Sequence, residues 1–211
     1  MHYEHVPKFL LDSEVKYLTH FLKYKIPWKN VVYRKKDRGQ ITTPRLTWCC
    51  GFHSNKMYGV NGIYPNRVPK ELLPLKDLIS NHLQNDFNYM LFAQYRDGND
   101  SITYHSDDED FLGRNPTIAS LTLGATRPFV LKNKRTKAAQ TFNLSAGDLF
   151  VMKNNCQADY LHAVPKIKDF TSGPRFSITF RKAINSKASW NYYTYNIGRN
   201  IHATTKLMHN A

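Results

Sequence analysis

The sequence predicts a mainly β domain with flanking helices, whose core is a β-sandwich, a jelly roll or a barrel. From Tyr89 onward, short runs of β-forming residues alternate with turn signals, as where YMLFAQY is followed closely by DGND. Two stretches before this point have the apolar spacing of amphipathic helices. The chain has 211 residues, of which 41% are hydrophobic, and this is enough for one domain with a full core.

The region before residue 89 is expected to contain two helices. The first is predicted over Asp12–Tyr24, with Asp12 or Ser13 as its N-terminal cap. Its apolar residues on one face are Val15, Leu18 and Leu22. The second helix is predicted over Pro69–Asp86, and we expect a break near Pro74 because proline has no N–H to donate within a helix.

A basic β-hairpin is expected between these helices. In the segment NVVYRKKDRGQITTPRLTWCC, β-forming residues flank a turn at Asp37–Gly39. Four positively charged side chains surround the turn: Arg34, Lys35, Lys36 and Arg38. Such a hairpin could contact a polyanion.

Charge and composition narrow the class of protein. With 30 Lys and Arg against 16 Asp and Glu, the net charge is +14, which favours a nucleic-acid partner slightly over a merely solvated surface. No run of about 18 apolar residues predicts a membrane span. The start of the chain lacks a basic region followed by an apolar one, and Cys49, Cys50 and Cys156 form no disulfide framework. We therefore expect a soluble intracellular protein, in either the nucleus or the cytoplasm.

The segment TYHSDDED, residues 103–110, contains a candidate metal site. In a strand, His105 and Asp107 would point to the same face because side chains alternate with a period of two. With His162 from a distant strand, they would form the two-histidine, one-carboxylate set of non-haem Fe(II) oxygenases. The alternative is a surface pairing that arises by chance among nine histidines.

The segment PRFSITFRK, which ends at Lys182, predicts a strand with two unlike faces. One face is apolar, and the other consists of Arg175, Ser177, Thr179 and Arg181. On an exposed edge this second face would simply be solvated. Inside a barrel, two buried guanidinium groups would require anions, and a dicarboxylate such as 2-oxoglutarate would provide two.

These segments resemble, in their order along the chain, the AlkB family of Fe(II)/2-oxoglutarate dioxygenases, and most closely its nucleic-acid alkylation-repair branch. The resemblance covers Trp28–Lys182, and its most specific parts are HSDDE, IASLTLGATR, LHAVP and RFSITFR. It implies a double-stranded β-helix, or jelly roll, with N-terminal helices and a nucleotide-recognition lid. The helices and lid would occupy residues 1–88, the catalytic core 89–183, and a partly disordered extension 184–211 of a single catalytic domain.

The resemblance also implies roles for individual residues. His105, Asp107 and His162 would be the catalytic residues that hold Fe(II), with dioxygen as co-substrate. Tyr95 and Arg175 would bind the distal carboxylate of 2-oxoglutarate, and Arg181 the carboxylate nearer the metal. Ser177 and Thr179 would line the same pocket.

The implied reaction is oxidative removal of methyl groups from bases such as 1-methyladenine and 3-methylcytosine, in DNA or RNA. A base must leave its stack to reach such a pocket. The residues that resemble substrate contacts are Arg45, Tyr58, Asp108 and Glu109, with the basic side chains of the hairpin on the phosphates. Because the hairpin is charged and offers no apolar wedge, we expect single strands to be preferred. We also expect the protein to be a monomer.

Three positions depart from the family pattern. Ala93 and Ser177 replace asparagines that usually contact 2-oxoglutarate, and Val60 stands where an aromatic side chain usually stacks on the base. Two alternatives therefore stay open. In the first, the protein is an oxygenase with a different substrate, such as a protein or N6-methyladenine in RNA. In the second, it is a non-catalytic nucleic-acid binder.

Overall fold

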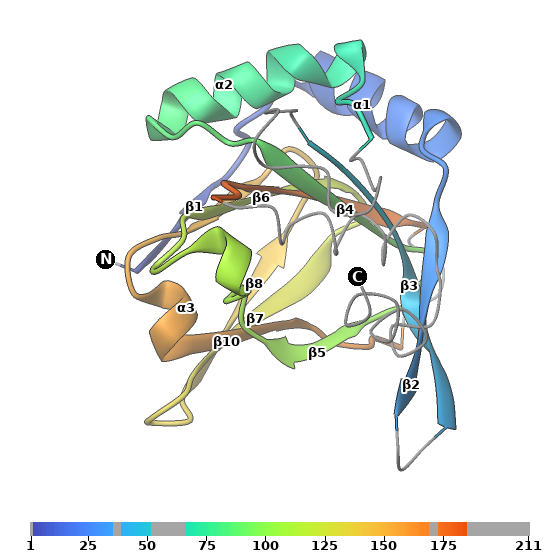
Figure 1. The fold of residues 1–211 in the computed structure, drawn as a ribbon. Coiled ribbons are helices and arrows are strands. Elements are labelled where there is room, and N and C mark those ends of the chain that lie inside the picture. The colour runs from blue at the N-terminus through green and yellow to red at the C-terminus, as the bar shows by residue number, and fades with distance from the viewer. Residues whose placement is uncertain (1, 36–38, 52–65, 169–172, 185–211) are drawn as a thin grey trace, which may run out of the picture.

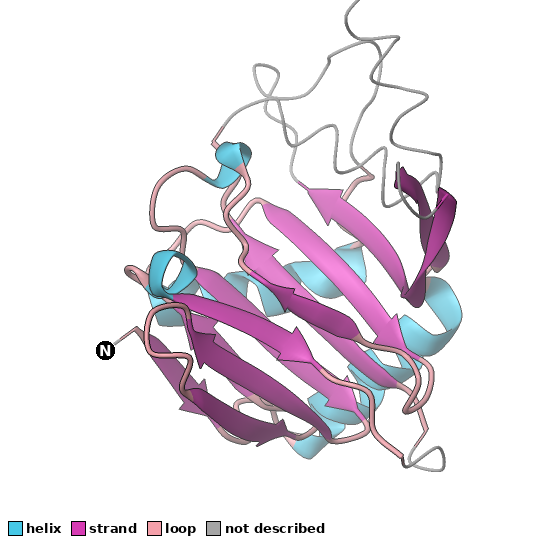
Figure 2. Ribbon diagram, turned by 90° about the horizontal axis from the view of Figure 1, so that it is seen from below, coloured by secondary structure: helices cyan, strands magenta, loops and turns pink. Residues whose placement is uncertain are grey.

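Two antiparallel β-sheets form the centre of the protein, and two helices cover the outer side of the larger sheet (Figures 1 and 2). This computed structural model describes residues 2–35, 39–51, 66–168 and 173–184. The architecture confirms the predicted mainly β fold with flanking helices. In the described part of the chain, no helix has the roughly 20 apolar residues needed to cross a bilayer.

The larger sheet has seven strands and the smaller has four. In spatial order, the larger sheet comprises β1 (Tyr3–Val6), β9 (Leu149–Met152), β6 (Ile118–Gly124), β11 (Arg175–Arg181), β4 (Tyr89–Tyr95), β3 (Gly39–Gly51) and β2 (Lys29–Lys35). The smaller sheet comprises, in the same way, β5 (Ile102–His105), β10 (Tyr160–Val164), β7 (Arg127–Asn133) and β8 (Ala139–Leu144). Neighbours in the chain are often distant in a sheet, so residues from separate segments meet between the two layers.

Helix α1 (Asp12–Lys25) begins where the sequence predicts but is capped differently. Its N-cap is Leu11, whose backbone N–H donates to the Glu14 carboxylate at 2.8 Å. The expected capping by Asp12 or Ser13 is therefore wrong, because Asp12 already belongs to the first turn. Leu18 and Leu22 are buried against the larger sheet, as their spacing predicts.

The second helical region is a 3-10 turn, η1 (Lys70–Leu72), followed directly by α2 (Leu73–Leu83). Pro74 does not break this helix but lies in its first turn, where a missing N–H removes no helical hydrogen bond. The helix ends before Asp86, because Gln84 adopts a left-handed conformation with φ of 48°. Two further short helices, which the sequence patterns did not predict, are η2 (Asp110–Leu112) and α3 (Cys156–Asp159).

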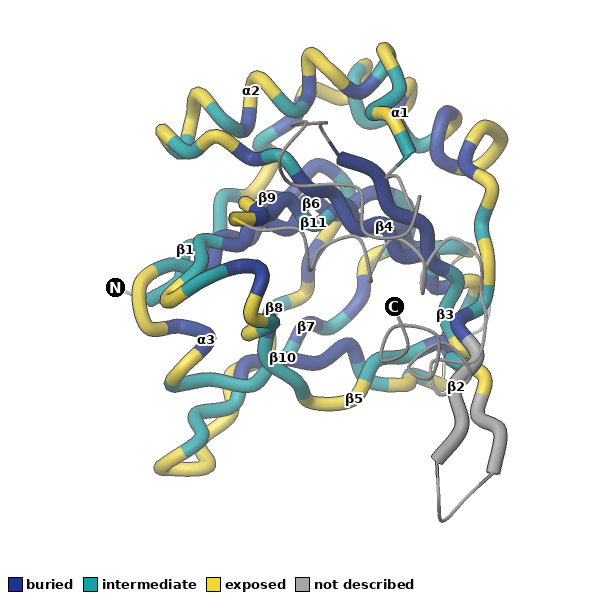
Figure 3. Tube along the Cα trace, in the orientation of Figure 1, coloured by how far each residue is buried: buried dark blue, intermediate teal, exposed yellow. Residues whose placement is uncertain are grey.

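Strand β11 is buried on both faces, as Figure 3 shows for the centre of the larger sheet. Phe176, Ile178 and Phe180 pack towards the helices in one apolar cluster. The alternate residues face the space between the sheets, where a second apolar cluster contains Leu91 and Phe129. The strand pairs with β4 on one side and β6 on the other, which fixes its register and hence the position of every polar side chain on its inner face.

Gly124 provides a stability prediction. Its φ is +76°, and a Cβ at this position would overlap the carbonyl oxygen of Pro174. We expect Gly124→Ala to lower the free energy of unfolding by about 3 kcal/mol or more, from backbone strain plus overlap. Gly173→Ala is the matched control, because its φ is +75° but, apart from its chain neighbours, no described residue has an atom within 4 Å of the added carbon. Urea titrations should show a much smaller loss for the control, and equal losses would contradict the overlap.

Candidate metal centre and co-substrate pocket

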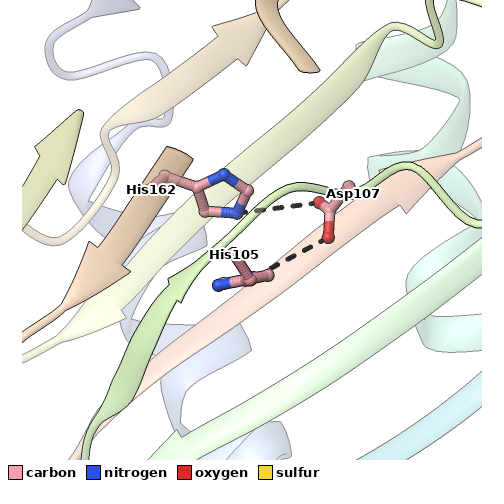
Figure 4. A group of neighbouring side chains, drawn as sticks. All are labelled: His105, Asp107 and His162. Carbon is pink, nitrogen blue, oxygen red and sulfur yellow. Dashed lines mark ion pairs between the residues drawn. The ribbon is translucent and has the colours of Figure 1, made fainter. Parts of the chain in front are cut away.

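The structure brings His105, Asp107 and His162 together between the two sheets (Figure 4). His105 ends β5, His162 lies opposite it on β10, and Asp107 follows β5 by two residues. The Nε2 atoms of His105 and His162 lie 3.8 and 3.9 Å from the two carboxylate oxygens of Asp107. One ligand atom from each residue falls within 4.8 Å of the others, as chelation of one ion requires.

Hydrogen bonding orients the His105 ring for metal binding. Its Nδ1 lies 2.9 Å from the carbonyl oxygen of Thr103, so this nitrogen is the donor, and in the neutral ring Nε2 is the one with a free lone pair. Nε2 is the atom that faces Asp107. The His105 side chain is 31% exposed, whereas Asp107 and His162 are buried. The cluster therefore has one accessible side.

The protonation states of the buried pair suit a metal ligand set. Burial lowers the pKa of His162 to about 3, so its imidazole is neutral near pH 7. Burial alone would raise the pKa of Asp107, but the surrounding positive charges, of which Arg181 contributes most, together outweigh burial and hold this pKa below its usual value. A neutral imidazole and an ionised carboxylate are the forms that bind divalent metals.

Two neighbouring residues, Arg181 and Gln157, hold Asp107 in place. The sequence patterns predicted neither contact. The Arg181 Nη2 donates to Oδ1 at 2.8 Å, and the Asp107 backbone N–H donates to Gln157 Oε1 at 2.8 Å. Gln157 is buried and lies on α3, and no pattern around it predicted this contact. Only the fold, which places α3 beside the loop after β5, identifies it.

A cavity beside the cluster contains the residues predicted to bind 2-oxoglutarate. Its lining includes Tyr95, Arg175, Ser177, Thr179 and Arg181. Figure 3 labels the two strands that contribute them, with β4 beside β11 in the larger sheet. Of the two alternatives that the sequence pattern left open for this polar face, the interior one holds, because Arg175, Ser177 and Arg181 are buried.

Arg175 is the best fit for an anion in this cavity. It is buried, its Nη2 donates to Thr122 Oγ1 at 3.0 Å, and its Cζ lies 5.2 Å from the centre of the Tyr95 ring. Its Nε has no hydrogen-bond partner, and no carboxylate in the described residues pairs with it. Burial, and then the nearby charge of Arg127, lower the pKa of Arg175 below its usual value. A bound carboxylate would satisfy this group, so the residues present fit 2-oxoglutarate.

Arg181 has protein partners of its own. Besides Asp107, its Nη1 lies 3.5 Å from Glu109 Oε1. The role implied for it, pairing with a 2-oxoglutarate carboxylate, would have to be shared with these two acids. Arg181 therefore links the metal ligand to the acid predicted to face the base.

The remaining predicted substrate contacts are placed only in part. Arg45 is half-buried and lines the cavity, and Asp108 is exposed. The backbones of Arg34 and Lys35 belong to β2, but their side chains lie outside the described part of the chain. Outside it altogether are Lys36, Arg38, Tyr58 and Val60. Ala93 and Ser177 are two of the positions that depart from the family pattern. They are direct partners on adjacent strands, and both line the cavity.

Comparison with known proteins places the whole region in one family. Residues 3–181 match the 2OG-Fe(II) oxygenase superfamily. The human alpha-ketoglutarate-dependent dioxygenase alkB homolog 3 is 34% identical over 189 residues, which cover 83% of this chain and 64% of that protein. The human DNA oxidative demethylase ALKBH2 is 32% identical over 131 residues, which cover 56% of this chain and 50% of that protein. The chain therefore spans less than two thirds of the length of these relatives.

A solved structure supports the fold independently. The structure of OsALKBH1 superimposes with a TM-score of 0.62 at 17% identity, covering 86% of this chain and 98% of the other. At this identity the likeness concerns the fold alone. It confirms the expected double-stranded β-helix, built here from antiparallel sheets that do not close into a barrel.

Proposed function

The chain belongs to the 2OG-Fe(II) oxygenase superfamily and is of the AlkB type, and from this premise we propose that it removes alkyl groups oxidatively from nucleic-acid bases. The observation that supports this most directly is the convergence of His105, Asp107 and His162 beside a buried Arg175 that no acid of the described residues pairs with. A metal site and an anion site in one cavity are what Fe(II) and 2-oxoglutarate, the cofactors of the family, require.

Each residue has a distinct part in the proposed mechanism. The two imidazole Nε2 atoms and the Asp107 carboxylate would hold Fe(II), and Arg175 with Tyr95 would hold the distal carboxylate of 2-oxoglutarate. When bound, these groups supply the oxidising chemistry, which consumes dioxygen and releases succinate and CO2. Arg181 keeps Asp107 ionised and oriented. The sheets close the buried side of the cluster to water, leaving the His105 side for substrate.

Glu109 supports a positively charged base as substrate. It is half-buried and lies 3.5 Å from Arg181, which itself holds Asp107. An acid near the reacting centre attracts 1-methyladenine or 3-methylcytosine, which carry a positive charge, more than an ordinary neutral base. The relative ALKBH2 is named as a DNA oxidative demethylase, which agrees with this substrate class.

The net charge of +14 and the charged segment between β2 and β3 support single strands as the preferred substrate. Basic side chains attract phosphates whatever the sequence. Prising a base out of a duplex usually involves an inserted apolar wedge, and the segment Arg34–Arg38 has none. An unpaired strand presents the base without that requirement.

A direct test is to incubate the protein with Fe(II), 2-oxoglutarate and oligonucleotides that contain 1-methyladenine, 3-methylcytosine or N6-methyladenine. Mass spectrometry should show loss of the methyl group from the first two, faster in single than in double strands, with release of formaldehyde. Reactions without 2-oxoglutarate are the control. Succinate formation stimulated by a peptide but by no oligonucleotide would transfer the activity to a protein substrate. Failure to bind Mn(II) at a 1:1 ratio would favour a non-catalytic binder.

A further inference from the structure

We propose that Arg127 is a positioning residue for the co-substrate pocket, through a clamp on three backbone carbonyl groups. The inference rests on the 2-oxoglutarate role proposed above for Tyr95 and Arg175. Arg127 is the first residue of β7, in the smaller sheet, and is not among the residues that line the cavity. Besides its charge near Tyr95 and Arg175, it acts on the pocket through the backbone segments that it holds.

The clamp consists of three short hydrogen bonds from one buried guanidinium. Nη1 donates to the carbonyl oxygen of Asp97 at 2.7 Å. Nη2 donates to the carbonyl oxygens of Asp100 and Pro165 at 2.9 and 2.8 Å. Only 3% of the Arg127 surface is exposed. Removing such a group leaves three carbonyls without their donor in a region that little water can enter.

The three carbonyls belong to segments that extend from the proposed site. Asp97 and Asp100 lie in the loop that joins Tyr95, at the end of β4, to the strand that carries His105. Pro165 directly follows β10, the strand of His162. A single side chain thus fixes the relative position of the loop after Tyr95 and the segment after His162.

Other hydrogen bonds also hold the loop that contains Asp100. The Asp100 carboxylate is held by Arg96, whose backbone N–H and Nε donate to Oδ2 at 2.9 and 2.8 Å. The loop is also tied to the β10 side by the Ile167 N–H, which donates to the Gly98 carbonyl at 3.0 Å. Arg127 adds three hydrogen bonds to these contacts.

Arg127 also lies close to the Tyr95 ring. Its Cζ is 5.8 Å from the ring centre, and that of Arg175 is 5.2 Å from the same centre. Two buried cations near one ring repel each other, and a protein retains such an arrangement only where other contacts hold both groups. The carbonyl clamp holds Arg127, and a bound carboxylate would hold Arg175. A planar guanidinium spans three acceptors in a fixed geometry, which the single ammonium of lysine cannot reproduce.

The test compares Arg127→Met and Arg127→Lys with the natural protein by calorimetric titration, first with Mn(II) and then with 2-oxoglutarate at saturating Mn(II). We expect the methionine variant to bind 2-oxoglutarate about 10- to 100-fold more weakly, as for loss of a supporting contact. Mn(II) affinity should change by less than about threefold, because Arg181, Gln157 and Thr103 still hold two of the metal ligands. Lysine should restore only part of the lost affinity.

Ile79→Ala is the control for a general loss of stability, since Ile79 is buried on α2 in the cluster under the helices, away from the cavity. It should lower Tm and leave both affinities unchanged. The inference is overturned if Arg127→Met binds 2-oxoglutarate as tightly as the natural protein, or if Mn(II) and 2-oxoglutarate affinity fall together. If the natural protein itself binds no 2-oxoglutarate in the presence of Mn(II), the proposed function fails, which is a different result.

Discussion

We expect His105→Ala to abolish succinate formation from 2-oxoglutarate and to weaken Mn(II) binding by about 100-fold or more. Loss of a supporting residue around a metal ligand already costs about 10- to 100-fold in affinity, so loss of the ligand itself should reach or exceed the top of that range. His105 is the best of the three for this test, because its side chain is part-exposed and its removal leaves less of a buried cavity than that of His162.

His20→Ala is the matched control for this variant. His20 is exposed on α1, on the outer side of the larger sheet, and contacts Tyr24 rather than the cavity. It should retain full turnover and full Mn(II) affinity. Turnover by His105→Ala at the natural rate would remove His105 from the metal site, and with it the proposed mechanism.

The second large effect is expected from Arg175→Leu, in which 2-oxoglutarate affinity and stability should change in different ways. Loss of a buried charge that pairs with a ligand carboxylate costs about 2–5 kcal/mol of binding, which is roughly 30- to 5,000-fold in Kd. In the free protein, however, this guanidinium is buried and no acid of the described residues pairs with it. A leucine there should therefore leave the free energy of unfolding unchanged or raise it.

Calorimetry with Mn(II) and 2-oxoglutarate measures the first change, and urea titration of the free protein measures the second. Arg175→Lys keeps the charge but not the two-pronged geometry, so its affinity should lie between those of the natural protein and the leucine variant. A leucine variant that loses stability and affinity together would indicate a structural arginine and contradict the anion site.

Much of this arrangement is predictable from alternation alone. Arg175, Ser177, Thr179 and Arg181 had to share a face in any strand, and their apolar neighbours had to face the other layer. The same rule paired His105 with Asp107, although β5 ends at His105 and the loop, held by Gln157, completes the orientation. His162, on another strand-like segment, was the candidate for the third ligand, and the family resemblance then supported this choice.

Contacts between distant segments were not predictable in the same way. Gln157 holds the Asp107 backbone, and Arg127 holds carbonyls near residues 97–100 and 165, because α3 and β7 come next to these loops only in the folded chain. Backbone carbonyls have no sequence signature, so a side chain that binds them gives no pattern to read. The start of α1 is another contact that the sequence did not predict. The Leu11 backbone N–H donates to Glu14, and neither Asp12 nor Ser13 is the N-terminal cap.

The position of each strand within its sheet has a consequence for how the site opens. Strand β11 has hydrogen-bonded neighbours on both sides. Among the strands that the structure describes, β5 is the edge of its sheet and pairs with β10 alone, in an irregular register. Edge strands fray at a lower free energy than central ones. Amide deuteration should therefore reach residues 102–105 long before residues 175–181. Two of the three proposed metal ligands, His105 and Asp107, lie on or next to the strand that opens more readily, whereas Arg175, the proposed anchor of the keto acid, lies on the central strand. Metal exchange would then proceed while the keto-acid anchor stays folded.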